Sequence, residues 1–327
     1  MNEMQPLIEL INVTKAYLVK NRSNPFRRKS IKAVNALTLS IYPGEIFGLV
    51  GESGCGKSTA GQMIAGIFPQ TSGEILYRGN SVSRLTAEEQ RAMRREIQIV
   101  LQDPYASLNP KRKIGWLIEE PLIINTNLTK RERLRRVEEM IETVGLDAGY
   151  LGRYPHELSG GQRQRVNIAA ALMLDSRLLV ADEAVSALDV SIQSQILNLL
   201  KSLKETRNLT YLFISHDLNV VQYMSDRIGV MYLGQLVECG SVEQVYGDAR
   251  HPYTKALLST IPSVTGNARE RIVLEGEVPS LLNPPSGCAF RTRCNRACAA
   301  CAQKAPELKC FQDGHCVRCH FAEQEAN

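Results

Sequence analysis

The chain has 327 residues, of which 44% are hydrophobic and 22% are charged, and its formal net charge is +5. These values are ordinary for a globular protein, and so small a charge does not by itself indicate nucleic-acid binding. No stretch approaches the roughly 20 apolar residues that a membrane-spanning helix needs. The first ten residues include Glu3 and Glu9 and lack the apolar run of a secretory signal. If the protein works at a membrane, we therefore expect another chain to provide the membrane-embedded part.

Short strands are predicted for most of the first fifty residues. Residues 7–13 alternate apolar and polar side chains, and residues 34–41 predict a second strand. The basic segment 20–32, which contains Asn, Ser and Pro, is predicted as a loop. Residues 46–50 predict a short buried strand, and a glycine-rich turn then leads into a helical pattern over residues 57–67.

The middle of the chain is rich in charge and helical in period. Residues 86–95 and 129–144 predict helices, and Thr129 with Glu132 has the spacing of a capping box. A further helix is predicted to begin after Gly160 and to run to about residue 174. We assign a helical subdomain to about residues 103–165.

Strands and helices alternate again after the helical subdomain. Residues 178–181 and 211–215 predict strands, and residues 192–205 between them predict a helix. Alternation of this kind is typical of a parallel sheet. The predicted fold class is therefore α/β, with a parallel-sheet core, an antiparallel edge near the N-terminus and a helical subdomain.

The composition changes beyond about residue 246, where prolines and cysteines accumulate. We place a domain boundary near His251, which divides the chain into residues 1–250 and a small cysteine-rich domain, residues 251–327. Seven of the nine cysteines lie between Cys288 and Cys319. Because no secretory signal is evident, we expect a reducing compartment, where clustered thiols bind metal more often than they form disulfides.

Residues 51–59, called the phosphate loop below, match the pattern G-x-x-x-x-G-K-[ST] between a predicted strand and a predicted helix. Glycines let backbone N–H groups turn toward phosphate oxygens, and a helix N-terminus adds a favourable dipole. Lys57 can reach the β- and γ-phosphates and Ser58 can ligate Mg²⁺, so the loop predicts a site for ATP with Mg²⁺. The predicted ATP-binding residues here are Gly51, Ser53, Gly54, Cys55, Gly56, Lys57, Ser58 and Thr59.

A second candidate site follows the apolar strand 178–181, which ends in Asp182 and Glu183. Asp182 fits a Mg²⁺ partner that acts through water. Glu183 is placed to polarise the attacking water as a general base. The alternative is an ordinary strand end, but buried carboxylates are costly and packing alone gives no reason for two of them.

The segment Leu158-Ser159-Gly160-Gly161-Gln162 stands before a predicted helix, and with it the chain resembles the ATP-binding-cassette (ABC) ATPases, whose signature is LSGGQ. The resemblance covers about residues 7–247. It implies a P-loop NTPase fold in which Tyr17 stacks on adenine, Gln102 acts as a Mg²⁺ ligand and catalytic residue, and His216 is the catalytic switch histidine. One departure from the family pattern is Ala184, where proline usually follows the catalytic glutamate.

The resemblance also implies a composite site. Ser159, Gly160, Gly161 and Gln162 would form a second anion cradle that closes over ATP held by the phosphate loop of a partner cassette. Two nucleotides would then be buried between two cassettes, with binding driving closure and hydrolysis releasing it.

Three further stretches, residues 103–110, 251–258 and 283–290, resemble the oligopeptide, dipeptide and nickel importer ATPases. Residues 114–122 are more similar to the second of the two ATPase subunits in such importers. The resemblance implies four kinds of partner or location: a second and different ATPase subunit, two transmembrane permease subunits, an extracellular solute-binding protein, and a peripheral position on the cytoplasmic face of the membrane. No nucleic-acid partner is expected.

The cysteines Cys288, Cys294, Cys301 and Cys319 have the spacing C-x5-C-x6-C-x17-C. This resembles the C-terminal pattern of the same importers, in which four cysteines hold a [4Fe–4S] cluster. Thiolate coordination also suits Zn²⁺, and the spacing does not separate the two. Unligated thiols are the third alternative, and the additional cysteines Cys298, Cys310 and Cys316 leave the ligand set open.

The sequence therefore predicts an ATP hydrolase that energises import of di- or oligopeptides, or of nickel or metal chelates. Two rival functions remain. One is a soluble cassette ATPase acting on nucleic acid or ribosomes, although the chain has neither a second cassette nor a long coiled-coil insert. The other is an iron–sulfur redox sensor, against which an intact Glu183 argues.

Overall fold

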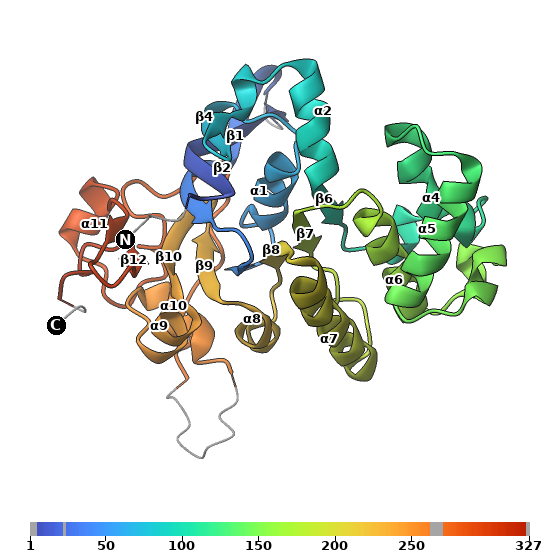
Figure 1. The fold of residues 1–327 in the computed structure, drawn as a ribbon. Coiled ribbons are helices and arrows are strands. Elements are labelled where there is room, and N and C mark those ends of the chain that lie inside the picture. The colour runs from blue at the N-terminus through green and yellow to red at the C-terminus, as the bar shows by residue number, and fades with distance from the viewer. Residues whose placement is uncertain (1–4, 22–23, 262–270, 325–327) are drawn as a thin grey trace.

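The structure is a computed structural model that describes residues 5–21, 24–261 and 271–324. Within these residues an eight-stranded sheet has the order β11-β12-β10-β9-β3-β8-β7-β6, and a four-stranded sheet has the order β2-β1-β4-β5. Helix α1 (Lys57–Ile64) lies between the two sheets (Figure 1). The apolar cluster on this side of the large sheet joins side chains from both sheets and from α1. The phosphate loop is therefore anchored between two layers.

The four-stranded sheet is antiparallel, as expected near the N-terminus. Its strands are β1 (Ile8–Asn21), β2 (Asn24–Ile41), β4 (Ser72–Tyr77) and β5 (Asn80–Ser81). The predicted loop over residues 20–32 is wrong, because strand pairing continues through most of it and only residues 22–23 lie outside the described part. Among the residues whose exposure is described, residues 28–30 of β2 and Leu18 of β1 are exposed. Exposed strand residues have no need of an apolar–polar alternation.

The predicted parallel sheet is confirmed by the pairing of five strands of the large sheet. These strands are β3 (Ile46–Val50), β6 (Ile97–Val100), β7 (Leu178–Asp182), β8 (Thr210–Ile214) and β9 (Arg227–Tyr232). Successive side chains enter opposite cores: Leu178 packs toward α1, whereas Leu179 packs into the larger cluster on the other face. Because both faces are covered, the strands are almost wholly apolar.

Helices cover the large sheet and form a separate lobe. Figure 1 shows α4, α5 and α6 gathered to one side of the sheet. The helices between β5 and β10 are α2 (Ala87–Glu96), α3 (Pro104–Ser107), α4 (Ile114–Asn125), α5 (Lys130–Thr143), α6 (Gly160–Leu172), α7 (Val190–Arg207) and α8 (Leu218–Met224). Short 3₁₀ turns lie at Val82–Arg84, Ala148–Gly152 and Pro155–Glu157. The predicted capping box at Thr129 is confirmed, with Glu132 closing it. None of the helices in the described ranges is long and apolar enough to cross a membrane.

The C-terminal segment joins the large sheet. Strand β10 (Gln235–Ser241) pairs antiparallel with β12 (Cys316–Val317), which pairs in turn with β11 (Lys309–Cys310). The helices of this region are α9 (Val242–Gly247), α10 (Pro252–Leu258) and α11 (Ala299–Gln303). Cys310 and Cys316 form a disulfide, which corrects the expectation of free or metal-bound thiols at these two positions. The domain boundary near His251 stays a prediction.

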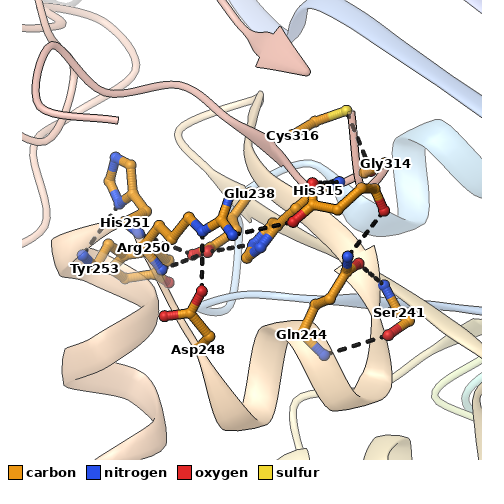
Figure 2. Close-up of polar contacts among 11 residues, drawn as sticks. Glu238, Ser241, Gln244, Asp248, Arg250, His251, Tyr253, Gly314, His315 and Cys316 are labelled. Carbon is orange, nitrogen blue, oxygen red and sulfur yellow. Dashed lines mark hydrogen bonds and ion pairs between the residues drawn. The ribbon is translucent and has the colours of Figure 1, made fainter. Parts of the chain in front are cut away.

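A buried carboxylate fixes this C-terminal segment to β10. Glu238 is fully buried, and its two oxygens accept hydrogen bonds from the backbone N–H groups of Arg250 (2.6 Å) and His251 (3.0 Å). The Nε2 atom of His315, from the turn between β11 and β12, lies 2.8 Å from the same carboxylate (Figure 2). Such full pairing offsets the cost of burying the charge.

The imidazole of His251 provides a pH-dependent part of the stability. Its Nδ1 atom accepts the N–H of Tyr253 (3.1 Å) at the start of α10, so the ring must keep that nitrogen unprotonated. Burial lowers the pKa of His251 to about 4, whereas an unfolded histidine has a pKa of about 6.5. A lowered pKa stabilises the folded state above pH 6.5, and this stabilisation is lost as the pH falls toward 4.

We predict that this one group lowers the free energy of unfolding by about 2 kcal/mol between pH 7.5 and pH 5. A His251→Asn variant retains a capping oxygen but cannot titrate, so its stability should fall less over the same interval. Urea unfolding at the two pH values measures the difference. The exposed His156, changed to Asn, serves as the control. Equal pH dependence of the His251→Asn variant and the unchanged protein would contradict this account.

Candidate active site

The phosphate loop connects β3 to α1 through glycines in unusual conformations. Gly51 has φ 149° and Gly56 has φ 104°. A Cβ atom at Gly51 would lie 2.2 Å from the carbonyl oxygen of Met231, and one at Gly56 would lie 2.2 Å from that of Ala33. Neither position has room for a side chain, so the loop backbone packs directly against neighbouring backbone. This packing holds the main-chain N–H groups of the loop in a fixed arrangement.

A cavity of about 460 Å³ opens over this loop. It brings together residues that are far apart in the sequence, because the parallel strands end on the same edge of the sheet. Its lining residues are Ala33, Ser53, Gly54, Gly56, Lys57, Ser58, Thr59, Gln102, Glu183 and His216. All three predicted catalytic residues, Gln102, Glu183 and His216, therefore share one cavity with six of the eight predicted ATP-binding residues of the phosphate loop.

Lys57 is a buried cation that lacks an anionic partner. Its side chain is 4% exposed, and its ammonium group donates to the carbonyl oxygens of Gly51 (2.8 Å) and Glu52 (3.1 Å). No carboxylate in the described part of the chain lies within ion-pair distance of it. Burying an unpaired charge is costly, so the site is suited to an anionic ligand such as a triphosphate.

Two oxygen ligands suitable for Mg²⁺ lie at the end of the loop. The hydroxyl of Ser58 donates to a carboxylate oxygen of Asp182 at 2.9 Å, and burial raises the pKa of Asp182. Hydroxyl, carboxylate and amide oxygens are the ligands that Mg²⁺ prefers. The third predicted ligand, Gln102, directs its side-chain nitrogen to Glu183, so its role toward the metal stays a prediction.

Glu183 is held in a strained conformation at the end of β7. Its φ of 49° lies in the left-handed region, and its N–H donates to the carbonyl of Ile214 at 2.9 Å. One carboxylate oxygen accepts from Gln102 (2.8 Å) and lies 3.3 Å from Nδ1 of His216. Strained non-glycine residues occur most often at functional sites. The geometry suits a carboxylate that positions and polarises a water molecule above the loop.

The lining lacks the predicted residues Gly51, Cys55, Asp182 and Tyr17 and includes one residue that was not predicted. Tyr17, predicted to stack on adenine, lies on β1 outside the lining, with the Lys15 ammonium 5.4 Å from its ring centre. Ala33 on β2 lines the cavity but was not predicted. Ala33 is placed there by the close approach of its carbonyl to Gly56, and nothing in the sequence predicts that approach. The role of Tyr17 stays a prediction.

The signature residues lie at the start of α6, in the helical lobe. Ser159 and Gln162 form a capping box, in which the Gln162 side chain accepts from the Ser159 N–H at 2.9 Å. A Cβ atom at Gly161 would lie 2.3 Å from Ile192, so α6 closely approaches α7. Neither these residues nor Gly160 line the cavity over the phosphate loop. Within one chain, the two predicted anion cradles are separate.

The four predicted metal-binding cysteines are neighbours but do not form a ready-made ligand set. The N–H of Cys288 donates to the carbonyl of Cys301 (2.7 Å), and burial raises the pKa of Cys288 to about 11, with smaller contributions from Cys301, Cys319 and Cys294. The sulfur of Cys301 lies 3.6 Å from that of Cys298, which was not in the predicted set. Among the described residues, no three His, Cys, Asp or Glu side chains are arranged to hold a metal ion. The predicted [4Fe–4S] or Zn²⁺ site therefore lacks support in this structure.

Comparison with known proteins decides the family. Residues 34–186 match the family model described as ABC transporter, and residues 237–301 match the one described as oligopeptide/dipeptide transporter, C-terminal region. The chain is 49% identical over 323 residues to the oligopeptide transport ATP-binding protein AppF of Bacillus subtilis, covering 97% of this chain and 98% of that one. It belongs to the ATP-binding proteins of oligopeptide and dipeptide transporters. The expected family resemblance is thus confirmed.

A second relative and a solved structure support the same family and fold. It is 46% identical over 324 residues to the dipeptide transport ATP-binding protein DppF of Escherichia coli, covering 99% of this chain and 96% of that one. Among solved structures, it resembles a dimeric, post-hydrolysis state of the ATP-binding cassette MJ0796 bound to ADP and Pi. The TM-score is 0.64 at 31% identity, over 72% of this chain and 98% of that chain. The fold is that of an ABC cassette, and the chain is an ATP hydrolase coupled to transport.

We predict that Glu183→Gln lowers the rate of ATP hydrolysis at least about 100-fold while ATP binding is retained, because the amide cannot accept a proton from water. Phosphate release and retained nucleotide should be measured on the ATPase purified with its accompanying subunits. Glu205→Gln, an exposed change on α7, is the control and should leave both unchanged. Hydrolysis at the native rate in Glu183→Gln would exclude Glu183 as the base.

Proposed function

We propose that this ATPase binds and hydrolyses ATP at an interface with a second cassette and so drives import of di- or oligopeptides through separate membrane subunits. The observation that carries the proposal is the cavity in which Gln102, Glu183 and His216 face the phosphate loop. The transported solute is inferred from the relatives, whose names include oligopeptide and dipeptide transport. Nickel or a metal chelate is the alternative solute.

In the proposed site, different groups of the chain bind the phosphates, hold Mg²⁺ and orient the attacking water. The backbone N–H groups of the phosphate loop and the Lys57 ammonium bind the phosphates. To do so, Lys57 replaces its hydrogen bonds to the carbonyls of Gly51 and Glu52 with hydrogen bonds to phosphate oxygens. Ser58 and Asp182 would hold Mg²⁺, which neutralises developing phosphate charge when bound. Glu183 orients the attacking water and accepts its proton, while Gln102 and His216 hold the carboxylate in place.

The second cassette is needed because the signature residues do not reach this cavity in the same chain. Ser159, Gly160, Gly161 and Gln162 would contact ATP bound by the partner, and the partner's signature would complete the site described here. The dimeric form of the related cassette MJ0796 supports such an arrangement. We propose that the partner is a different ATPase chain and that this one is the second ATPase subunit of the transporter.

The helical lobe is the proposed contact with the membrane subunits. Exposed apolar side chains follow β6 and lie on α3 and α4: Tyr105 is 66% exposed and Ile124 is 70% exposed. Apolar side chains left in water are typical of protein interfaces. The lobe would dock on the permease subunits at the cytoplasmic face of the membrane, and an extracellular binding protein would deliver the solute. No step in this cycle uses the cysteine cluster.

Of the rival functions, the soluble cassette acting on nucleic acid or ribosomes predicts no membrane partner. The redox sensor would use the cysteine cluster as its sensing group, and that cluster lacks a metal-holding arrangement within the described residues. Membrane association therefore separates the proposed function from the first rival, and transport separates it from the second.

We predict that the chain co-fractionates with membranes that contain its permease subunits and that Ile124→Asp reduces this association about tenfold or more, because a charge replaces an apolar contact. ATP binding should be unchanged. Val273→Asp, an equally exposed apolar position near the C-terminus, is the matched control. Uptake assays with a dipeptide, a longer peptide and nickel then identify the solute. A chain that stays in the soluble fraction when the permease is present would contradict the proposal.

A further inference from the structure

The second residue of the phosphate loop, Glu52, faces away from the ATP cavity and is held by the C-terminal part of the chain. Its N–H donates to the hydroxyl oxygen of Tyr253 at 3.0 Å. Its carboxylate accepts from one guanidinium nitrogen of Arg293 at 2.9 and 3.0 Å. Its carbonyl accepts from Lys57 and from the N–H of Cys55. Every polar group of Glu52 is therefore engaged.

Both partners of Glu52 are buried in a compact aromatic cluster. The Arg293 side chain is 8% exposed and Tyr253 is fully buried. The ring of Tyr253 lies 4.7 Å from that of Tyr232 and 5.4 Å from that of Phe290. The N–H of Arg293 donates to the carbonyl of Phe290 at 3.0 Å, and the Arg293 guanidinium lies 6.0 Å from the centre of the Tyr232 ring. The two contacts to Glu52 thus come from one closely packed region.

Tyr253 is positioned by the buried Glu238 network. Figure 2 shows His251 and Arg250 at the Glu238 carboxylate, with His315 on its other side. The Nδ1 atom of His251 accepts a hydrogen bond from the N–H of Tyr253 and so caps the start of α10. A continuous set of hydrogen bonds therefore joins the β11–β12 turn, through β10, to the first peptide of the phosphate loop.

A carboxylate at this point of the loop is electrostatically unfavourable for the loop's function. It lies one residue from Ser53, which lines the cavity where phosphate charge collects. Two like charges this close repel, and partial burial weakens the screening by water. The Arg293 guanidinium lies directly on the carboxylate and cancels its charge. The pair also turns Glu52 away from the cavity.

We propose that Arg293 and Tyr253 are positioning residues for ATP: from the C-terminal region they neutralise Glu52, keep it out of the cavity and fix the first peptide of the phosphate loop. The proposal rests on ATP hydrolysis at this loop and not on which solute is transported. It gives the cysteine-rich region a defined contact with the ATP site without any metal.

The test is a double-mutant cycle on the full chain, purified with its accompanying subunits. Arg293→Gln should weaken Mg·ATP binding about tenfold or more, because Glu52 is left as an unpaired charge. Glu52→Gln should bind within about threefold of the native affinity, since it removes the charge that needs cancelling. The double variant Glu52→Gln/Arg293→Gln should recover to within about threefold.

Steady-state kinetics separate positioning from a general loss of structure. Arg293→Gln should raise KM for ATP while leaving kcat within about twofold, because the pair touches neither Glu183 nor the attacking water. Tyr253→Phe should raise KM by a smaller factor, about threefold, since it removes only the acceptor for the Glu52 N–H. Arg291→Gln, a neighbouring arginine that contacts Ser286, is the matched control and should change neither constant.

Two outcomes would overturn the proposal. One is native ATP affinity in Arg293→Gln. The other is a double variant that binds no better than Arg293→Gln, because the loss would then come from the fold of the C-terminal region and not from the Glu52 charge. If the double variant recovers ATP binding but the transporter imports no peptide, only the proposed solute is overturned.

Discussion

A loop that binds phosphate through its backbone must itself be held by other backbone, because side chains would fill the space that the ligand needs. In this ATPase the constraint is met at Gly51 and Gly56, whose positions leave no room for a Cβ atom beside Met231 and Ala33. Met231 lies on β9 of the large sheet and Ala33 lies on β2 of the N-terminal sheet, so both sheets contact the loop through their backbone.

Buried charges in this structure fall into two kinds. Glu238 and Arg293 have partners within the chain, which offset the cost of removing them from water. Lys57 donates to the carbonyl oxygens of Gly51 and Glu52 and to the Cys55 sulfur, and Asp182 accepts from the Ser58 hydroxyl; among the described residues neither forms an ion pair. The first kind stabilises the fold, and the second kind is suited to an anion with its metal. The partly buried Glu52 is of the first kind, because Arg293 pairs with it, although it lies in the ligand-binding loop.

Sequence predicted the features that depend on neighbouring residues. The phosphate loop, the Asp182–Glu183 pair and the capping box at Thr129 are local patterns: the loop connects β3 to α1, the pair lies at the end of β7, and the capping box is present. The pairing of β1 with residues 28–32 of β2 was missed because exposed strand residues need no alternation of apolar and polar side chains. The contact between Glu52 and Arg293 joins residues that are 241 positions apart, and neither residue carries a signal of the other. The cysteine spacing predicted a metal site that the described residues do not support, and the Cys310–Cys316 disulfide and the Cys298 contact depend on local turns that the spacing does not reveal.

In the proposed arrangement the C-terminal region holds the phosphate loop in its binding conformation, which amide hydrogen exchange of the loop can measure. Exchange reports the free energy of local opening. In the ATP-free protein, the amides of residues 51–59 should exchange at least about tenfold faster in Arg293→Gln than in the unchanged chain, with α5 unaffected. Addition of Mg·ATP at saturating concentration should restore protection in both. Equal exchange of the loop in the two ATP-free proteins would contradict the account.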